Sequence, residues 1–387
     1  MLSMQCQLDF GSNDKNWPAK AFKLDLDCEI PLTITGVFGH SGSGKSSLLK
    51  WLAGLEQQGI ASKSELNIIE RASSDDEQRR QRLTDLKTEQ RPFAWQQQQA
   101  LLFPHLTVSE NLALIDKHSV TSRTRPYSVD QVIEWTGIGP LLSQPVTSLS
   151  GGEAQRVSFA RTLITGKRII LLDEPFTALD WSTRVAMLAL IRQLHQVYQL
   201  AFIIVSHSLA ELSYCCQHII HLVQGQLVQQ GSSEQVLPKL SETSTEQTFS
   251  LLDFVEPSDT HGQQYGLMAC GLKGCEQKLW LTQQSYTNAG SRVRVAANKV
   301  SLARAQQSQS SMLNCLSGEI VAIDSMAVQK SDQQLRQHKS TQHQSNQSVL
   351  VTVLIGQQLL RAEISSYSCQ QLSLAKGQKV YAQFKAL

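Results

Sequence analysis

The stretch "GHSGSGKSS", from Gly39 to Ser47, decides the fold of this 387-residue chain. It fits the pattern G-x-x-x-x-G-K-[ST], whose glycines let the backbone curl so that successive N–H groups point at phosphate oxygens. Lys45 is predicted to bind the β- and γ-phosphates of a nucleotide, and Ser46 to offer its hydroxyl to Mg²⁺. The candidate nucleotide ligands are Gly39, His40, Ser41, Gly42, Ser43, Gly44, Lys45, Ser46 and Ser47.

The flanks of this loop favour a phosphate-binding loop over a chance turn. Residues 21–38 begin with alternating apolar and polar residues and end in an apolar, β-branched run. This pattern predicts a half-buried strand followed by a buried one. After the loop, leucines recur at helical spacing, and the N-terminus of a helix favours bound phosphate. These leucines are Leu48, Leu49, Leu52 and Leu55.

A second motif, "RIILLDEP" from Arg168 to Pro175, adds two carboxylates. Its apolar residues predict a buried strand, and Asp173 at the carboxyl end of that strand can reach a Mg²⁺ ion. Glu174 follows directly and is the candidate to polarise the water that attacks the γ-phosphate. An isolated Asp-Glu pair before a proline can also be a helix cap, but the phosphate-binding loop in the same chain favours the catalytic role.

Strands and helices alternate through the first part of the chain. Residues 168–172 and 201–206 predict buried strands, with a helical pattern at 182–198 between them. Residues 107–165 are mostly helical, and their first four residues have the spacing of a capping box. The polar segment 56–91 is expected to form edge strands and a solvated loop. Alternation of this kind predicts an α/β fold with a parallel sheet covered on both faces.

The composition changes after about residue 238. Residues 238–261 are predicted to be a polar linker, and short alternating strands in 262–387 predict a small all-β domain. An insert at 325–348 has almost no large apolar residue, which predicts a disordered hairpin tip. Its two histidines, His338 and His343, are expected to be solvated rather than metal ligands. The predicted strands are 278–282, 292–297, 319–324, 349–355, 359–364 and 379–386.

Composition limits the compartment and the partners. The 35 Lys and Arg nearly balance the 33 Asp and Glu, which gives little reason to expect a nucleic-acid partner. The eight cysteines contain no Cys-x-x-Cys pair and are predicted to be free thiols in a reducing compartment. No apolar run reaches the roughly 18 residues of a membrane span, and the N-terminus has no signal-peptide pattern. We expect a cytosolic protein whose membrane association is peripheral.

A second glycine-rich loop, "SLSGGEAQR" from Ser148 to Arg156, lacks the lysine of the first. With "ALD" (Ala178–Asp180) and "VSH" ending at His207, it resembles the ATP-binding subunits of ABC transporters in both order and spacing. The resemblance covers about residues 20–235. It implies that Asp180 belongs to the D-loop and that His207 is a catalytic switch histidine.

The resemblance also implies the fold and the assembly. The fold would be a P-loop NTPase with a RecA-like core and a helical subdomain at about 99–165, together forming a nucleotide-binding domain at 1–237. In this family two identical subunits bind two ATP molecules head to tail. The signature loop of one subunit caps the γ-phosphate held by the other, so a second lysine is not needed, and hydrolysis is slow until the dimer closes. The capping residues are Ser150, Gly151, Gly152 and Glu153.

Two further roles follow from the resemblance. A glutamine in the run Gln96–Gln99 would contact Mg²⁺ and sense the transmembrane partner; counting back from Phe103 selects Gln98, with the register open by one residue. An aromatic residue would stack on adenine, and Trp17 and Phe22 are both candidates. His40 stands where close relatives have proline, which is tolerable because backbone N–H groups make most of the phosphate contacts.

The C-terminal part resembles the regulatory domain of molybdate importer ATPases. The segments Arg292–Ala303 and Ser310–Ile323 carry the likeness, and the last strands match a Mop or TOBE-like barrel of the OB type. Ser311 and Asn314 would correspond to an oxyanion site. Leu313 stands where that motif has arginine, so this barrel is expected to bind molybdate weakly or not at all. A role in stabilising the dimer is an equal alternative.

The sequence therefore predicts the ATP-hydrolysing subunit of a molybdate importer, with ATP and Mg²⁺ as cofactors. Its partners would be a second copy, integral membrane permease subunits and, indirectly, a periplasmic oxyanion-binding protein, at the cytoplasmic side of the inner membrane. One alternative is an importer of another oxyanion or solute, such as sulfate, tungstate, a polyamine or a sugar. A soluble ABC ATPase acting on ribosomes or DNA is disfavoured by the neutral charge, the single nucleotide-binding domain and the C-terminal barrel.

Overall fold

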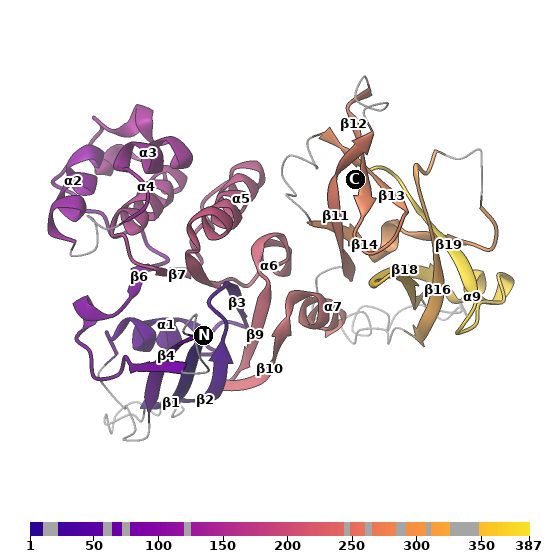
Figure 1. Cartoon of the computed structure of the whole chain (residues 1–387), viewed down its shortest axis with the longest axis horizontal. Coiled ribbons are helices and arrows are strands. Elements are labelled where there is room, and N and C mark those ends of the chain that lie inside the picture. The colour runs from indigo at the N-terminus through magenta and orange to yellow at the C-terminus, as the bar shows by residue number, and fades with distance from the viewer. Residues whose placement is uncertain are drawn as a thin grey trace, which may run out of the picture. The chain divides into compact units, whose positions relative to one another are not determined.

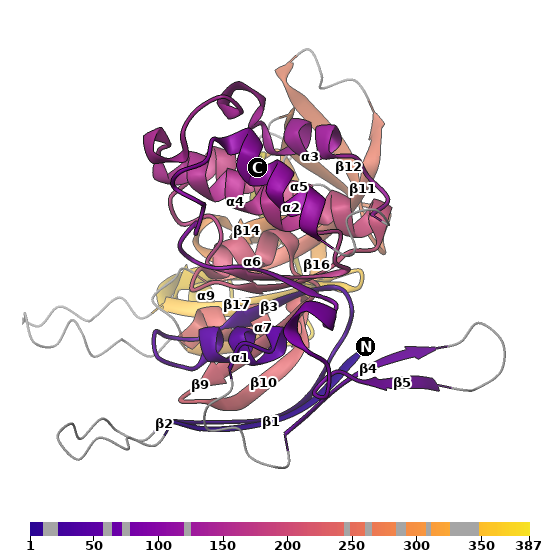
Figure 2. The same cartoon turned by 90° about the vertical axis from the view of Figure 1, so that its left-hand side faces the viewer.

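The computed structural model divides into two compact units, Met1–Leu237 and Pro238–Leu387 (Figures 1 and 2). Each unit is described by itself. None of the helices in the described part of the chain has the length and apolar composition that a membrane span requires. The described residues are 1–10, 22–56, 64–71, 78–119, 125–243, 248–259, 265–283, 292–306, 311–325 and 348–387.

The first unit is built on a ten-stranded sheet in the order β5-β4-β1-β2-β10-β9-β3-β8-β7-β6. Its outer strand β5 carries Arg80 and Arg82, each 3.7 Å from a carboxylate oxygen of Glu65 on β4. The strands are β1 (Leu2–Phe10), β2 (Phe22–Ile30), β3 (Ile34–Phe38), β4 (Glu65–Arg71), β5 (Gln78–Arg82), β6 (Phe93–Gln96), β7 (Ile169–Asp173), β8 (Ala201–Val205), β9 (His218–Val223) and β10 (Gln226–Ser232).

The centre of this sheet is parallel and buried. β3 pairs in parallel with β8 and β9, and β7 pairs in parallel with β6 and β8. Every residue of β3, β7 and β8 is buried, as expected of strands covered on both faces. The predicted α/β fold with a parallel sheet is confirmed, and the segment 56–91 contributes the predicted strands β4 and β5 at one edge.

Helices cover the sheet and form a separate group beside it. α1 buries Leu48, Leu49 and Leu52 in the core, which confirms three of the four predicted leucines, whereas Leu55 lies beyond the end of the helix and is exposed. In Figure 1, α2, α3 and α4 gather at one end of the unit, as the mostly helical pattern predicted. The helices are α1 (Lys45–Ala53), α2 (Val108–His118), α3 (Val129–Thr136), α4 (Gly151–Ile164), α5 (Trp181–Tyr198), α6 (Leu209–Cys215) and α7 (Ser233–Thr243), which crosses the division between the units.

The second unit contains two antiparallel sheets around one apolar core. Their orders are β13-β12-β11-β14 and β15-β19-β16-β17-β18. Each of the six predicted strand segments overlaps an observed strand, so the all-β prediction is confirmed. The elements are β11 (Phe249–Asp259), β12 (Leu267–Leu272), β13 (Lys278–Thr282), β14 (Arg292–Ala296), β15 (Ser301–Ala303), β16 (Asn314–Ser325), β17 (Ser348–Ile355), β18 (Gln358–Ser365), α9 (Ser366–Gln371) and β19 (Lys379–Phe384).

The predicted linker at 238–261 differs from the structure. It contains the end of α7 and the strand β11, which pairs with both β12 and β14. The buried side chains of Leu252 and Phe254 place β11 in the core of the second unit. The polar residues on either side of this short apolar segment hid the strand. The predicted insert lies outside the described residues from 326 to 347, together with His338 and His343.

Candidate nucleotide-binding site

The phosphate-binding loop lies between the end of β3 and the start of α1. Gly44 has a φ of 96°, and a Cβ there would lie 2.7 Å from the ring of Phe22. A Cβ at Gly39 would lie 2.4 Å from the carbonyl oxygen of Leu222. Contacts this short leave room for glycine alone at both positions. The loop therefore lies close against β2 and β9, which contribute Phe22 and Leu222.

Lys45 and Ser43 direct polar atoms into this loop. The buried ammonium group of Lys45 donates to the carbonyl oxygens of Gly39 at 2.7 Å and His40 at 3.0 Å. Burial lowers the pKa of Lys45, because removal from water disfavours its charged form. The hydroxyl of Ser43 is buried and has no hydrogen-bond partner among the described residues. A bound phosphate would supply acceptor oxygens to both side chains, so the loop fits such a group.

Two of the predicted Mg²⁺ ligands meet at the end of β7. Asp173 is buried there, and desolvation raises the pKa of its carboxyl group, while a hydrogen bond with Ser46 opposes that rise. In the described ranges no cluster of three or more His, Cys, Asp or Glu side chains could hold a metal ion alone. A hydroxyl and a carboxylate suit Mg²⁺ when phosphate oxygens complete its shell.

Glu174 lies at the centre of the site in a strained conformation. Its φ is 44°, in the left-handed region that non-glycine residues rarely adopt, and its N–H donates to the carbonyl of Val205 at 3.0 Å. Gln98 donates from Nε2 to one carboxylate oxygen at 3.1 Å, and Nδ1 of His207 lies 3.3 Å from the other. The structure thus brings together three predicted site residues from separate loops.

The glutamine run divides into two environments. Gln96 is buried, and its amide donates to the carbonyl oxygens of Gln155 at 3.3 Å and Pro175 at 3.4 Å. Of these two glutamines, Gln98 contacts the carboxylate of Glu174, whereas Gln96 holds backbone groups.

The signature loop forms the N-terminus of α4. Ser150 is the N-cap residue, and its hydroxyl accepts from the N–H of Glu153 at 3.3 Å. The Glu153 carboxylate accepts from the hydroxyl and the N–H of Ser150, which lowers its pKa. This capping box, which the S-x-x-E spacing could have predicted, leaves the first N–H groups of the helix without a partner inside the helix. Gly151 and Gly152 are the first two residues of that helix.

Asp180 caps the next helix, α5. Its carboxylate accepts from the N–H of Thr183 at 3.0 Å and from the hydroxyls of Ser182 and Thr183 at 2.6 and 2.7 Å. These bonds, the one from Ser182 first, lower the pKa of Asp180. Gln155 on α4 holds the preceding residues, because its amide oxygen accepts from the N–H of Ala178 at 3.0 Å. Sequence reasoning missed this role of Gln155, although the residue lies within the quoted signature motif.

The remaining candidates have less defined roles. Phe22 packs against Gly44 and the core, beside the phosphate-binding loop, while Trp17 lies outside the described residues. His40 is exposed. Ser41, Gly42 and Ser47 take their predicted places in the loop and at the start of α1.

The proposed oxyanion residues of the second unit do not form an open site. Asn314 is fully buried, and its amide oxygen accepts from the N–H of Trp280 at 2.7 Å. Its amide nitrogen donates to the carbonyl oxygens of Trp280 and Lys385, both at 3.0 Å. Both ends of this side chain therefore tie backbone segments together. Ser311 and Leu313 are exposed.

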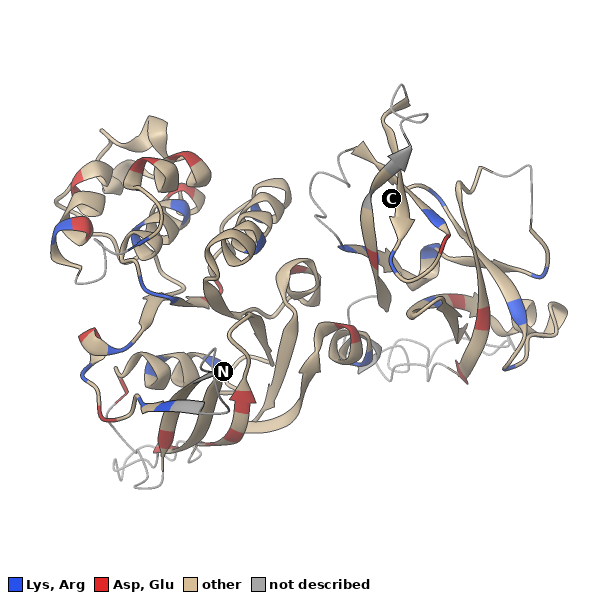
Figure 3. Ribbon diagram, in the orientation of Figure 1, with Lys and Arg blue, Asp and Glu red and all other residues tan. Residues whose placement is uncertain are grey.

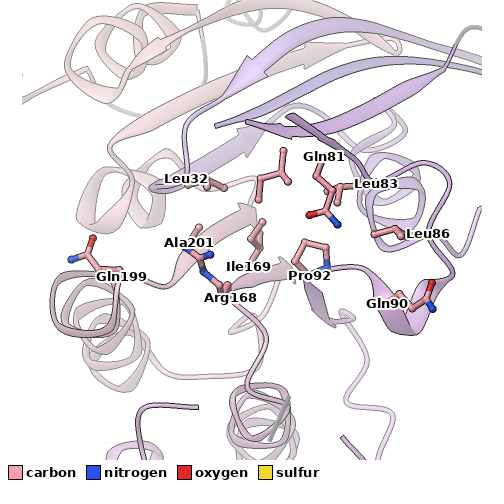
Figure 4. A pocket seen from close by; sticks show the side chains of 11 residues that line it. Leu32, Gln81, Leu83, Leu86, Gln90, Pro92, Arg168, Ile169, Gln199 and Ala201 are labelled. Carbon is pink, nitrogen blue, oxygen red and sulfur yellow. The ribbon is translucent and has the colours of Figure 1, made fainter. Parts of the chain in front are cut away.

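A cavity of about 150 Å³ lies at the other end of the parallel strands (Figure 4). None of the predicted site residues is among its lining residues, so it is separate from the nucleotide site. Its lining contains both apolar and polar side chains. The lining residues include Leu32, Leu83, Leu86, Arg168, Ile169 and Ala201.

These features define the class of protein as an ATP-binding cassette ATPase. The family model "ABC transporter" matches residues 24–177, and the "TOBE domain" model matches residues 340–386. A dimeric structure of a bacterial ABC transporter cassette superposes with a TM-score of 0.50 at 22% identity, covering 60% of this chain and 99% of that chain, which supports the fold alone.

Full-length relatives specify the family. The "Molybdenum import ATP-binding protein ModC" of Methylococcus capsulatus is 32% identical over 376 residues, 96% of each chain. The protein of the same name from Aromatoleum aromaticum is 33% identical, covering 96% of this chain and 91% of its own. That of Pseudomonas fluorescens is 30% identical, with 100% and 99% covered. The chain belongs to the family of molybdenum import ATP-binding proteins.

Proposed function

We propose that this chain is the ATP-hydrolysing subunit of a molybdate importer. The observation that carries the proposal is the carboxylate of Glu174, held between Gln98 and His207 beside the phosphate-binding loop. The named relatives match over nearly the whole chain and so include the second unit as well as the ATPase. Residues 1–237 would form the nucleotide-binding domain, and the second unit would be regulatory.

The site residues divide the work of phosphoryl transfer. Bound ATP with Mg²⁺ supplies the γ-phosphoryl group and part of the charge neutralisation. Lys45 and the N–H groups of its loop would hold the phosphates, and Ser46 and Asp173 would hold the metal, with Gln98 beside them. Glu174 would orient and polarise the attacking water.

His207 lies where it can hold the Glu174 carboxylate in position or bind a γ-phosphate oxygen. The first role needs the observed 3.3 Å contact with Glu174, and the second needs a donor nitrogen directed at the phosphate. The residue is therefore proposed to act as a switch between these two partners.

The complete site would contain residues of two copies. The N–H groups of the signature loop, with Ser150, would cap the γ-phosphate bound by the partner copy. Such a head-to-tail dimer surrounds each γ-phosphate with donors on all sides in a site without bulk water. The dimer would bind permease subunits at the cytoplasmic face of the inner membrane and depend indirectly on a periplasmic binding protein.

Loss of the gene tests the transport proposal. A strain without this chain should lose molybdoenzyme activity at trace molybdate and regain it at excess molybdate, and a strain whose only copy carries Glu174→Gln should behave in the same way. Tungstate should compete with molybdate because its size, charge and shape are nearly the same, and sulfate should compete poorly. Normal activity at trace molybdate, in a strain with no second uptake system, would exclude molybdate and favour another oxyanion or solute.

A further inference from the structure

An ion pair joins two loops of the site that lie far apart in the sequence. Nη1 of Arg184 on α5 lies 2.7 Å from Oε1 of Glu211 on α6, and these side chains are only 20% and 11% exposed. One of the loops is the D-loop, Ala178–Asp180, which leads into α5. The other is the switch loop, Ser206–Ser208, which carries His207 and leads into α6.

Arg184 holds the main chain of the D-loop. Its Nη2 donates to the carbonyl oxygens of Leu179 at 2.8 Å and Thr177 at 3.1 Å. On the other side of the same segment, Gln155 of the signature helix accepts from Ala178 N–H and donates to the Thr177 hydroxyl. The D-loop is thus fixed between α4 and α5, and Arg184 holds one carbonyl within it, that of Leu179, and one just before it, that of Thr177.

Glu211 holds the switch loop with its second oxygen. Oε2 accepts from the buried hydroxyl of Ser206 at 2.6 Å, and the same hydroxyl accepts from the N–H of Ser208 at 3.0 Å. These two residues flank His207, so one carboxylate fixes the backbone on either side of the switch histidine. The two oxygens of Glu211 therefore serve two different loops.

We infer that the pair of Arg184 and Glu211 is a positioning device that couples the two ATP sites of the dimer. This inference rests on the proposed function. His207 faces Glu174 in the nucleotide site of its own subunit. The signature and D-loops belong to the site of the partner copy. A movement of the switch loop on ATP binding is passed through Glu211 and Arg184 to the D-loop, and so to the second site.

A purely structural role for the pair makes different predictions. If it only held α5 against α6, other links between these helices would do the same work. Arg192 offers a matched control, since its Nη1 donates across the same helix pair to the carbonyl of Tyr214 at 3.3 Å. Removing one partner of a buried ion pair leaves an uncompensated charge, so single variants are paired with an apolar double variant that avoids it.

The test uses the full-length protein and follows ATP hydrolysis against ATP concentration. The variants are Glu211→Gln, Arg184→Lys, the double variant Arg184→Met with Glu211→Leu, and the control Arg192→Ala. We expect the first three to lower kcat roughly 10- to 100-fold, as displaced catalytic groups do. The affinity of the single subunit for ATP should stay within about threefold of wild type, and the Hill coefficient should fall toward about 1.

The control and the double variant decide the outcome. Arg192→Ala should keep the wild-type kcat. If the apolar double variant also hydrolyses ATP cooperatively at the wild-type rate, the pair is only a helix contact and the inference is wrong. A further variant combines Glu211→Gln with Arg184→Lys. If its kcat is no lower than that of either single variant, the result supports a single shared pathway.

Failure of the proposed function is recognised separately. If the wild-type chain hydrolyses no ATP, or if Glu174→Gln hydrolyses it equally fast, the ATPase assignment is at fault. ATP-dependent dimerisation of the Glu174→Gln chain, followed by gel filtration, then tests the coupling without hydrolysis. Adding Glu211→Gln should raise the ATP concentration for half-maximal dimer by about tenfold, a change of about 1.4 kcal/mol, and no change would refute the coupling.

Discussion

At the scale of single residues, Glu174 combines backbone strain with a fixed carboxylate. A left-handed φ costs a residue with a side chain about 1–3 kcal/mol, which the surrounding structure must offset. The backbone bond to Val205 and the contacts with Gln98 and His207 do so. The strain directs the carboxylate into the site instead of along β7, and this direction could not be predicted from the sequence "LLDEP".

Replacement of Glu174 by glutamine should separate binding from hydrolysis. The amide has nearly the same shape but cannot accept a proton from water. We expect turnover to fall at least about a hundredfold, the usual effect of losing a general base, while ATP binding persists and an ATP-bound dimer accumulates. Single-turnover hydrolysis and gel filtration with ATP would measure both. Near-normal turnover would contradict the role of Glu174.

The cysteines should divide into two classes of reactivity. Burial raises the pKa of Cys6 and Cys28 to about 12 and that of Cys270 to about 11. The half-buried Cys275, Cys315 and Cys369 should react first with iodoacetamide at pH 8, because the reagent can reach their sulfur atoms. Mass spectrometry of the native chain would show the order, and rapid labelling of Cys6 would be inconsistent with it.

The same shifts predict how stability depends on pH. A thiol whose pKa is higher in the folded state holds its proton more tightly there. Its contribution to stability is complete below about pH 9 and is lost as the pH rises toward about 12. The midpoint temperature of thermal unfolding of the wild type should therefore fall as the pH rises through this range. A chain with Cys6→Ala and Cys28→Ala should lose less stability over the same pH interval.

At the scale of elements, the capping box of α4 places the signature serine at a helix N-terminus. Ser150→Arg should abolish hydrolysis while leaving ATP binding to the single subunit nearly intact, since Ser150 would act on the nucleotide of the partner. Mixing this variant with Lys45→Ala should restore some activity, because one composite site then contains both changes and the other contains neither. Loss of ATP binding by the Ser150→Arg monomer would contradict a role in the partner's site.

The sequence predicted the elements whose signals are local. The continuous apolar runs of β7 and β8, the phosphate-binding loop and the strands of the second unit were identified from neighbouring residues. The strand β11 was missed because polar residues surround its short apolar segment. Four identical neighbours left the position of Gln98 open, and only the contact with Glu174 favours it.

Roles that depend on distant contacts could not be predicted. Arg184 and Glu211 lie 27 positions apart, and nothing in the local pattern of either residue shows that they meet. Asn314 matched an oxyanion motif, but its partners lie 34 and 71 positions away. Such contacts arise only when strands and helices pack, so the sequence gives the residue types without their partners.

At the scale of the whole molecule, the first unit contains the proposed ATP site, whereas the candidate oxyanion residues of the second unit do not form an open site. Lys, Arg, Asp and Glu are interspersed on the elements of both units (Figure 3). In the second unit Asn314 is engaged with backbone groups and Leu313 cannot donate a hydrogen bond. Selection of the transported anion would then belong to the permease and the binding protein.

Titration of molybdate into the full-length protein should therefore give little or no heat, with or without ATP. Isothermal calorimetry at protein concentrations of about 50 μM would detect dissociation constants up to the millimolar range, for which the binding free energy is about −4 kcal/mol. Sulfate serves as the matched control. Tight, stoichiometric molybdate binding would contradict this prediction about the second unit, although it would support a role in molybdate transport.

The outer strand β5 forms one edge of the ten-stranded sheet, and its residues bear on contacts between copies. An open sheet edge offers unpaired backbone groups to other chains and is a common start of aggregation. The strand reads "QRRQR", with three arginines in five residues and no apolar side chain. Two such edges meeting in an antiparallel pair would bring like charges together, which is unfavourable. The arginines of β5 would therefore disfavour edge-to-edge pairing of two copies along this strand.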